Sequence, residues 1–174
     1  CDPSDVPLAR DARGCPRLGD DVLWTSLSHA RGCVALALCA IGPVGVDIEL
    51  STRAATMPEI AGRVCHPVDA ASIAGLLPPA WNTALLELWV RKEAFLKAAG
   101  VGLEREMNSF AAAGNQVLPL CPSGEMTQLR MLDVGPQWVA AVAAPPGIQL
   151  EHAWLRPGAP QSRNDPCRSE ASDR

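Results

Sequence analysis

Two acidic side chains occupy alternate positions of the segment 44–50, whose sequence is VGVDIEL. Successive side chains of a β-strand point to opposite faces, so Asp47 and Glu49 are expected on one face and the apolar residues on the other. Two carboxylates on one face repel each other unless a cation lies between them, and Mg²⁺ is a cation that such oxygen ligands suit. A strand whose acids lie in water explains the same pattern, and on this pair alone it is the favoured interpretation.

A second group of charged residues lies within 81–99, the strongest helical pattern in the chain. The apolar stripe of this helix consists of Leu85, Leu88, Phe95 and Ala99. Lys92 interrupts the stripe, and Trp89, Glu93 and Lys97 follow at intervals of four beside it. A surface Glu93–Lys97 ion pair, and a Lys92 stem lying along apolar surface with its ammonium in water, explain these residues one at a time. Together, three charges between Trp and Phe on one helix favour a partly buried charged site.

Two weaker candidates precede these segments. Ser28 and His29 stand together at the end of a short apolar segment, where a lone histidine is usually structural or exposed. Three arginines, at positions 10, 13 and 17, surround a Gly-Cys-Pro turn. They suit either a solvated loop or a clamp for a multiply charged anion.

The composition limits the class of protein. The chain has 174 residues, of which 48% are hydrophobic and 20% charged, and a formal net charge of −4. This composition suits one ordinary domain with a core, and it argues against a disordered chain or a basic nucleic-acid-binding protein. No segment reaches the roughly 18–20 apolar residues of a membrane span. Seven cysteines without a CxxC pair favour a reducing, cytoplasmic location.

The elements that must position these residues follow from apolar periodicity and from Gly and Pro. Helices are expected at 57–77, with a break at Pro67, and at 81–99, between Pro78-Pro79 and Gly100. Strands are expected at 22–27, 33–41, 44–50, 128–134, 137–143 and 149–155, the last three as an antiparallel meander. Residues 157–174 have almost no apolar content and are expected to be a disordered tail.

The two charged segments together resemble the Sfp-type 4′-phosphopantetheinyl transferases. The sequence GVDIE at 45–49 and the sequence WVRKEAFLKAAGVGL at 89–103 match the family pattern G-[IV]-D-x-E followed by W-x-x-K-E-A-x-x-K-x-x-G-x-G-L. Weaker matches, in the order of the family, are GCPRL at 14–18, LSH at 27–29, RVCHPVD at 63–69 and WVAAVA at 138–143. The resemblance covers about residues 10–143.

The resemblance implies an α+β fold. In this family two similar α/β lobes form a pseudo-dimer, each lobe being a small antiparallel sheet packed on a long helix, and coenzyme A binds in the cleft between them. By that comparison residues 1–43 are the remainder of a first lobe, incomplete here because its opening strands and helix are absent, and residues 44–156 are the second lobe with the metal site.

The resemblance also implies roles for individual residues. It implies that Asp47, Glu49 and Glu93 are Mg²⁺ ligands and that Glu93 is also the general base. Lys97 and Lys92 are implied as catalytic phosphate contacts. The implied coenzyme A contacts are Arg10 on the 3′-phosphate, Ser28 and His29 on phosphate and adenosine, and the turn Gly14, Cys15 and Pro16 under the adenine. The family commonly has Lys where Cys15 stands, so one cation is lost there.

The implied activity is transfer of the 4′-phosphopantetheine arm of coenzyme A to a serine of an apo acyl or peptidyl carrier protein, with release of 3′,5′-ADP. The protein is then expected to be a monomer with no nucleic-acid or membrane partner. One alternative is a truncated, non-catalytic relative that still binds coenzyme A or a carrier protein. Another is a metal-binding structural domain, which predicts that Arg10 and His29 face away from Asp47.

Overall fold

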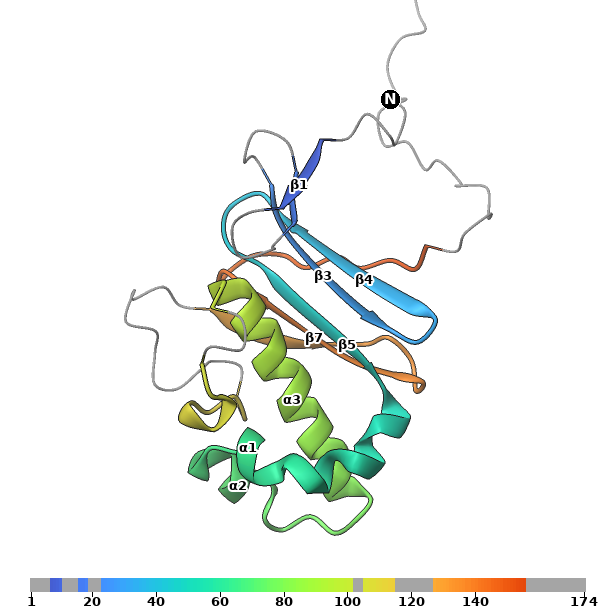
Figure 1. Ribbon diagram of the computed structural model, residues 1–174, viewed down its shortest axis with the longest axis vertical. Helices are drawn as coiled ribbons and strands as arrows, with labels where there is room; N and C mark the ends of the chain where they lie inside the picture. Colours follow the sequence, from blue (N-terminus) through green and yellow to red (C-terminus); the bar gives the residue numbers. More distant parts are fainter. Residues whose placement is uncertain (1–6, 11–15, 19–22, 102–104, 115–126, 156–174) are drawn as a thin grey trace, which may run out of the picture.

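One long helix packs against antiparallel strands in the computed structural model, which describes residues 7–10, 16–18, 23–101, 105–114 and 127–155 (Figure 1). This arrangement confirms the α+β fold class. Strands β1 (Leu8–Arg10) and β2 (Pro16–Leu18) pair with each other, and β3 (Trp24–Ala30) and β4 (Cys33–Cys39) form a hairpin. Strands β5 (Gly45–Leu50), β6 (Gln128–Leu132) and β7 (Trp138–Ala144) form a sheet in the order β5-β7-β6.

The segment between β5 and the long helix is more irregular than the apolar pattern predicts. It begins as a 3₁₀ helix, η2 (Ser51–Ile60), and continues as the short helices α1 (Ala61–Val64) and α2 (Pro67–Ile73). The predicted break at Pro67 is confirmed, because this residue begins α2. His66 caps that helix: its ring Nδ1 accepts from the Val68 amide at 3.2 Å, and its own amide donates to Asp69 Oδ2 at 3.1 Å.

The long helix α3 (Ala80–Ala99) forms as predicted, to within one residue at its start. It follows Pro78-Pro79 and ends at Gly100, which has a φ of 64°, a left-handed conformation that glycine adopts without steric cost. Its predicted stripe is buried at Leu85, Leu88 and Phe95 but is exposed at Ala99. The buried surface is also wider than one stripe, because α3 packs on the sheet on one side and on η2, α1 and α2 on another (Figure 1).

Both faces of the β5-β7-β6 sheet are covered. The face toward α3 contributes small residues of β7, Ala141 and Ala143, to the main core. The opposite face contributes Val142 to a smaller cluster with Val44 and Cys39, the last residue of β4. Asp47 therefore lies on a strand buried on both sides, with 5% of the residue exposed, and the expectation of a half-exposed strand is wrong.

Gly45 sets how closely α3 approaches β5. A Cβ atom at this position would lie 1.9 Å from the Ala94 carbonyl oxygen and 2.5 Å from the Ala98 nitrogen. Gly45→Ala is expected to push the helix away from the strand and to lower the free energy of unfolding by about 1–3 kcal/mol. Chemical denaturation measures this, with Gly62→Ala as the control because nothing lies within 4 Å of its added Cβ. Equal stability of the two variants would contradict the close packing.

The strand predicted at 149–155 is absent from the described part of the chain, so the expected three-stranded meander is wrong. After Gly147, which has a φ of 80°, Ile148 and Leu150 pack beside the Val44–Val142 cluster instead of pairing with a sheet edge. The His152 ring nitrogen Nε2 lies 3.0 Å from the Asp133 carbonyl oxygen. The predicted tail at 157–174 lies outside the described residues.

Within the described residues, none of the helices combines the length and apolar character required to cross a bilayer.

Candidate functional site

The centre of the candidate site is the Asp47 carboxylate, where β5 meets α3. Lys97 donates to Asp47 Oδ1 at 2.8 Å and to the Val46 carbonyl oxygen at 3.0 Å. The side chains of Asp47 and Lys97 are 7% and 28% exposed, so the pair lies at the boundary between core and surface. The structure thus brings one acid of β5 and one charged residue of the long helix together, a contact that the sequence did not specify.

Ser28, on β3, contacts the same carboxylate oxygen. Its hydroxyl donates to Asp47 Oδ1 at 2.8 Å and accepts from the Ile48 amide at 3.4 Å. Ser26, two residues earlier on β3, accepts from the Val46 amide at 3.1 Å. Strand β5 is an edge of its sheet, and these two buried hydroxyls satisfy amide groups that would otherwise lack partners.

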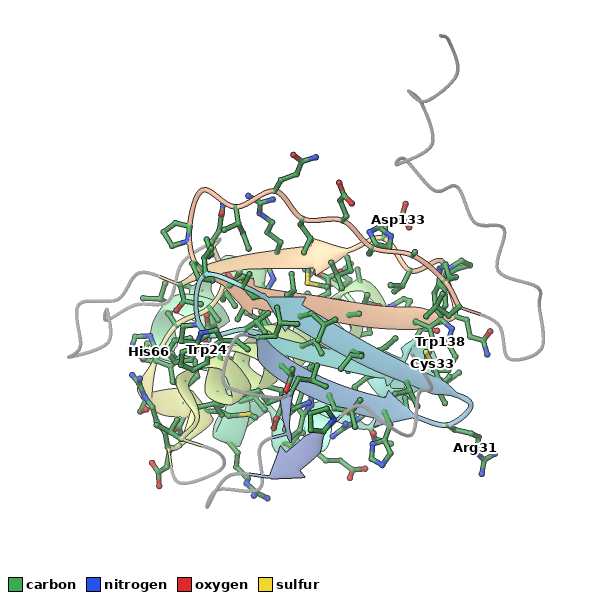
Figure 2. The ribbon with its side chains drawn as sticks, turned by 90° about the horizontal axis from the view of Figure 1, so that it is seen from above. Trp24, Arg31, Cys33, His66, Asp133 and Trp138 are labelled. Carbon is green, nitrogen blue, oxygen red and sulfur yellow. The ribbon has the colours of Figure 1, made fainter. Side chains whose placement is uncertain are left out.

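This geometry gives Ser28 a contact that the resemblance does not imply, while its assignment to coenzyme A stays a prediction. The resemblance places it on a coenzyme A phosphate, but a hydroxyl has one proton to donate, and that proton is directed to Asp47. Ser28 is therefore a positioning residue for Asp47 in this structure. His29 is exposed, on the other side of β3 from Ser28, because adjacent residues of a strand alternate. Figure 2 shows Arg31, at the turn of the same hairpin, pointing away from the molecule.

Ser28→Ala is expected to lower the free energy of unfolding by about 1–3 kcal/mol, because it leaves the Ile48 amide without a partner and removes one of the two hydrogen bonds to Asp47 Oδ1. Ser28→Thr keeps the hydroxyl and is the matched control. Urea denaturation of both variants measures the difference. An alanine variant as stable as the threonine variant would contradict the role of the hydroxyl.

The other predicted coenzyme A contacts are only partly described. Arg10 and Pro16 stand opposite each other in the β1–β2 pair, where the structure places their backbone. Gly14 and Cys15 lie outside the described residues. The assignment of these four residues to coenzyme A therefore stays a prediction.

Glu49 is paired with an arginine that the sequence analysis did not single out. Arg53 Nη1 forms an ion pair with Glu49 Oε1, and the Arg53 guanidinium carbon lies 4.5 Å from the centre of the Trp89 ring. The pattern of a Glu and an Arg four residues apart was visible in the sequence. That spacing brings side chains together on a helix, whereas Glu49 lies in strand β5, so the sequence did not indicate this pair.

The environment of Glu93 disfavours its charged form. Burial raises the pKa of Glu93 above the ordinary value of 4.5, and the Asp47 carboxylate raises it further, while Lys97 and Arg53 act in the opposite direction. Burial likewise raises the pKa of Glu49, and Arg53 opposes that shift. The influence of Asp47 on both groups shows that the three carboxylates share one electrostatic environment. A carboxylate with a raised pKa is a stronger base than an ordinary one.

These shifts predict a pH dependence of stability. The folded chain keeps protons on Glu49 and Glu93 over a range in which the unfolded chain, with pKa values near 4.5, has lost them. The contribution of both groups to the free energy of unfolding is therefore expected to fall as the pH rises from about 4.5 through their raised pKa values. Glu93→Gln removes one titrating group, so its stability should decrease less over this range than that of the unaltered chain. Denaturation at stepped pH, without divalent ions, measures the two slopes, and equal slopes would contradict the shift.

The carboxylates fit a hard divalent cation by chemistry. Asp47 Oδ2 is buried and accepts no hydrogen bond, whereas Oδ1 accepts two. All three acids offer oxygen ligands, as Mg²⁺ prefers. In the described part of the chain, however, no three acidic, histidine or cysteine side chains are gathered closely enough to hold a metal ion. Lys97 and Arg53 neutralise Asp47 and Glu49 in the arrangement observed.

Lys92 lies in the interior rather than at this site. The resemblance places it on phosphate, but its side chain is 0% exposed and its ammonium lies 2.6 Å from Asp69 Oδ2. The ammonium also donates to three carbonyl oxygens, those of Val64 at 2.7 Å, Met107 at 2.7 Å and Phe110 at 2.6 Å. An ammonium has three donors, so these four oxygens leave none for a phosphate. We correct the assignment: Lys92 joins α1, α2 and the segment 107–110 to α3.

Asp69 is the partner that sequence reasoning missed. It is 0% exposed, and besides Lys92 it accepts from the Ala112 amide at 2.8 Å and from the His66 amide. Asp69 follows His66 by three residues and Pro67 by two, which is the spacing of an acid at a helix start. This spacing was visible in the sequence and could have drawn attention to Asp69. That pattern does not indicate which cation the acid will meet.

Comparison with known proteins places these residues in a family. A family model described as the 4′-phosphopantetheinyl transferase superfamily matches residues 43–142, a range that contains β5, α3 and the three acids. The chain is similar to the 4′-phosphopantetheinyl transferase HetI of a Nostoc species, with 30% identity over 111 residues, which are 60% of this chain and 46% of that protein. It is also similar to the 4′-phosphopantetheinyl transferase of Bacillus subtilis, with 29% identity over 125 residues, which are 68% of this chain and 54% of that protein.

A third relative is the 4′-phosphopantetheinyl transferase AcpT of Salmonella typhi, 33% identical over 78 residues, which are 45% of this chain and 41% of that protein. The chain thus spans about half the length of the curated relatives it matches. The match over 43–142 covers more than half of the chain and includes the site built from Asp47, Glu93 and Lys97. The chain therefore belongs to the 4′-phosphopantetheinyl transferase superfamily.

Proposed function

We propose that this chain contributes the metal and general-base site of a transferase that moves the phosphopantetheine arm of coenzyme A to a serine of an apo acyl or peptidyl carrier protein. The observation that carries the proposal is the meeting of Asp47 and Lys97 at the junction of β5 and α3, with Glu49 and Glu93 in the same electrostatic environment. Family membership supplies the class of reaction, in which an alcohol attacks one phosphorus of a pyrophosphate.

The main need of such a reaction is to neutralise the pyrophosphate and to hold the two reactants in line. When bound, Mg²⁺ would supply positive charge to the phosphate oxygens. The residues that would hold it are Asp47, through the buried oxygen that lacks a partner, together with Glu49 and Glu93. Lys97 adds a fixed positive charge beside Asp47 and is the residue we assign to the phosphate of the departing 3′,5′-ADP.

Glu93 is the proposed acceptor of the serine proton. Its raised pKa supports this role, because a stronger base removes a proton from an alcohol more readily. A cation bound directly to Glu93 would lower that pKa and weaken the base. A water molecule between Glu93 and the cation satisfies both roles, since the water can pass the serine proton to the carboxylate.

The proposed function also implies a co-substrate, a protein partner and a location in the cell. Coenzyme A is the co-substrate, and the apo carrier protein is the macromolecular partner. We propose that the protein acts in the cytoplasm, where both are available, as a monomer and without nucleic-acid or membrane partners.

The test is an intact-mass measurement on an apo carrier protein incubated with this chain, coenzyme A and Mg²⁺. Transfer is expected to add about 340 Da, the mass of a phosphopantetheinyl group joined through one phosphoester. Reactions without Mg²⁺, or with carrier protein whose acceptor serine is replaced by alanine, should show no gain. An unchanged mass over a panel of acyl and peptidyl carriers would contradict the proposal. If coenzyme A still bound the chain in that case, the chain would be a binding module rather than a transferase.

A further inference from the structure

Each of the two acids on β5 is neutralised by a cation of the chain itself. Lys97 pairs with Asp47 and Arg53 pairs with Glu49. The two pairs differ in their surroundings. Asp47 is also held by Ser28, whereas the pair of Glu49 and Arg53 is more open, with side chains 21% and 33% exposed. Of the two cations, Arg53 is therefore the one that can leave its carboxylate more easily, because its ion pair is already the more exposed.

We propose that Arg53 is a tethered counter-cation that occupies Glu49 when no divalent ion is bound and competes with that ion for the Glu49 carboxylate. The inference rests on the metal site of the proposed function. A carboxylate oxygen that already accepts a guanidinium must give it up, or share it, to bind Mg²⁺. Arg53 also places a positive charge close to where the ion must enter, and this repels the ion.

The position of Arg53 in the fold allows its guanidinium to leave Glu49 and still remain beside the site. It is the third residue of η2, directly after β5, and its backbone carbonyl accepts from the Thr56 hydroxyl at 3.1 Å. Its guanidinium lies over Trp89, one turn before Glu93 on α3. This cation–π contact does not depend on Glu49, so it can keep the guanidinium beside the site after the carboxylate has been released.

The same contacts explain why the acids are not gathered around one point in the observed arrangement. The ion pair holds Glu49 Oε1 at the Arg53 guanidinium, and the described residues form no three-ligand cluster. Arg53 also lowers the pKa of both Glu49 and Glu93, which shows that its charge acts on the acids of both elements. Arg53 thus compensates the repulsion between these carboxylates in the absence of metal.

The test compares Mg²⁺ binding by the unaltered chain and by Arg53→Gln, using calorimetric titration without coenzyme A or carrier protein. Arg53→Gln removes the charge but keeps a polar, though shorter, side chain. It is expected to bind Mg²⁺ about three- to tenfold more tightly, because one competitor and one repelling charge are removed. Arg63→Gln is the matched control, since it removes an equal charge from an exposed position on α1, and its affinity should stay within about twofold of the unaltered chain.

A second readout separates competition from a merely structural ion pair. Without Mg²⁺, Arg53→Gln should unfold at a lower temperature than the unaltered chain at neutral pH, and saturating Mg²⁺ should remove most of that difference. Unchanged or weaker Mg²⁺ binding by the folded variant would overturn the inference, as would an absence of binding to both proteins. Intact-mass transfer assays report on the proposed function separately, because they can fail while the metal affinities still differ as expected.

Discussion

Replacing Glu93 with Gln is expected to reduce phosphopantetheine transfer by a factor of about 10²–10⁴ while leaving the fold intact. The amide cannot accept the serine proton, and it is a poorer ligand than a carboxylate for a divalent cation. The side chains are nearly equal in size, and the environment of Glu93 already disfavours its negative charge, so the neutral amide should not destabilise the metal-free chain.

The control for this experiment is Glu87→Gln, a substitution of a half-buried glutamate on the same helix. Initial rates of mass gain on an apo carrier protein should fall for Glu93→Gln and stay within about twofold for Glu87→Gln. Thermal unfolding of both variants confirms that the loss is not caused by misfolding. Full activity in a folded Glu93→Gln protein would show that the site has been assigned to the wrong carboxylate.

Replacing Lys92 with Met is expected to lower the free energy of unfolding by about 3–5 kcal/mol. Met fills a similar volume, so the cost is mainly electrostatic. It leaves the Asp69 carboxylate buried without its cation, and it leaves three carbonyl oxygens without the donor that now joins them. Because these oxygens belong to separate segments, the contacts between α1, α3 and the segment 107–110 should loosen together.

A second substitution tests whether the charge causes the loss. In the Lys92→Met protein, Asp69→Asn removes the uncompensated charge, and its carbonyl can still accept from the Ala112 amide. The double variant should therefore be more stable than Lys92→Met alone, although Asp69→Asn by itself should be destabilising. Urea denaturation of the four proteins measures this coupling. Additive effects would contradict the account of Lys92 and Asp69 as a buried ion pair.

The sequence was sufficient to predict the elements that carry the site. Alternation in 44–50 predicted β5, and the periodicity of 81–99 between prolines and glycine predicted α3. The charged side of that helix was expected to form a partly buried site, and Lys97 does meet Asp47. These successes share a physical cause, since strand and helix periods are local and fix the direction of each side chain.

The failures concern contacts between distant parts of the chain. The sequence placed Lys92 within the apolar stripe of the helix but did not indicate its partners. The carbonyl groups that it contacts belong to Val64, Met107 and Phe110, which are 28, 15 and 18 positions away in the sequence. The contacts of Ser26 and Ser28 with β5 were not predicted either, because nothing local reveals that β3 lies along the edge of β5. The segment 149–155 has the composition of a strand, but whether it pairs depends on an available sheet edge. Such features depend on tertiary packing, which local pattern does not encode.

The most direct test of the account is calorimetric titration of Mg²⁺ into the unaltered chain and into the variants Asp47→Asn and Glu93→Gln. These substitutions alter one proposed ligand from β5 and one from α3. The account predicts one ion bound per chain, with affinity reduced at least about tenfold in each variant, because each removes a carboxylate that would hold the same ion directly or through a water molecule. Mg²⁺ binding that is equally strong in all three proteins, or absent from the unaltered chain, would contradict a metal site shared by β5 and α3.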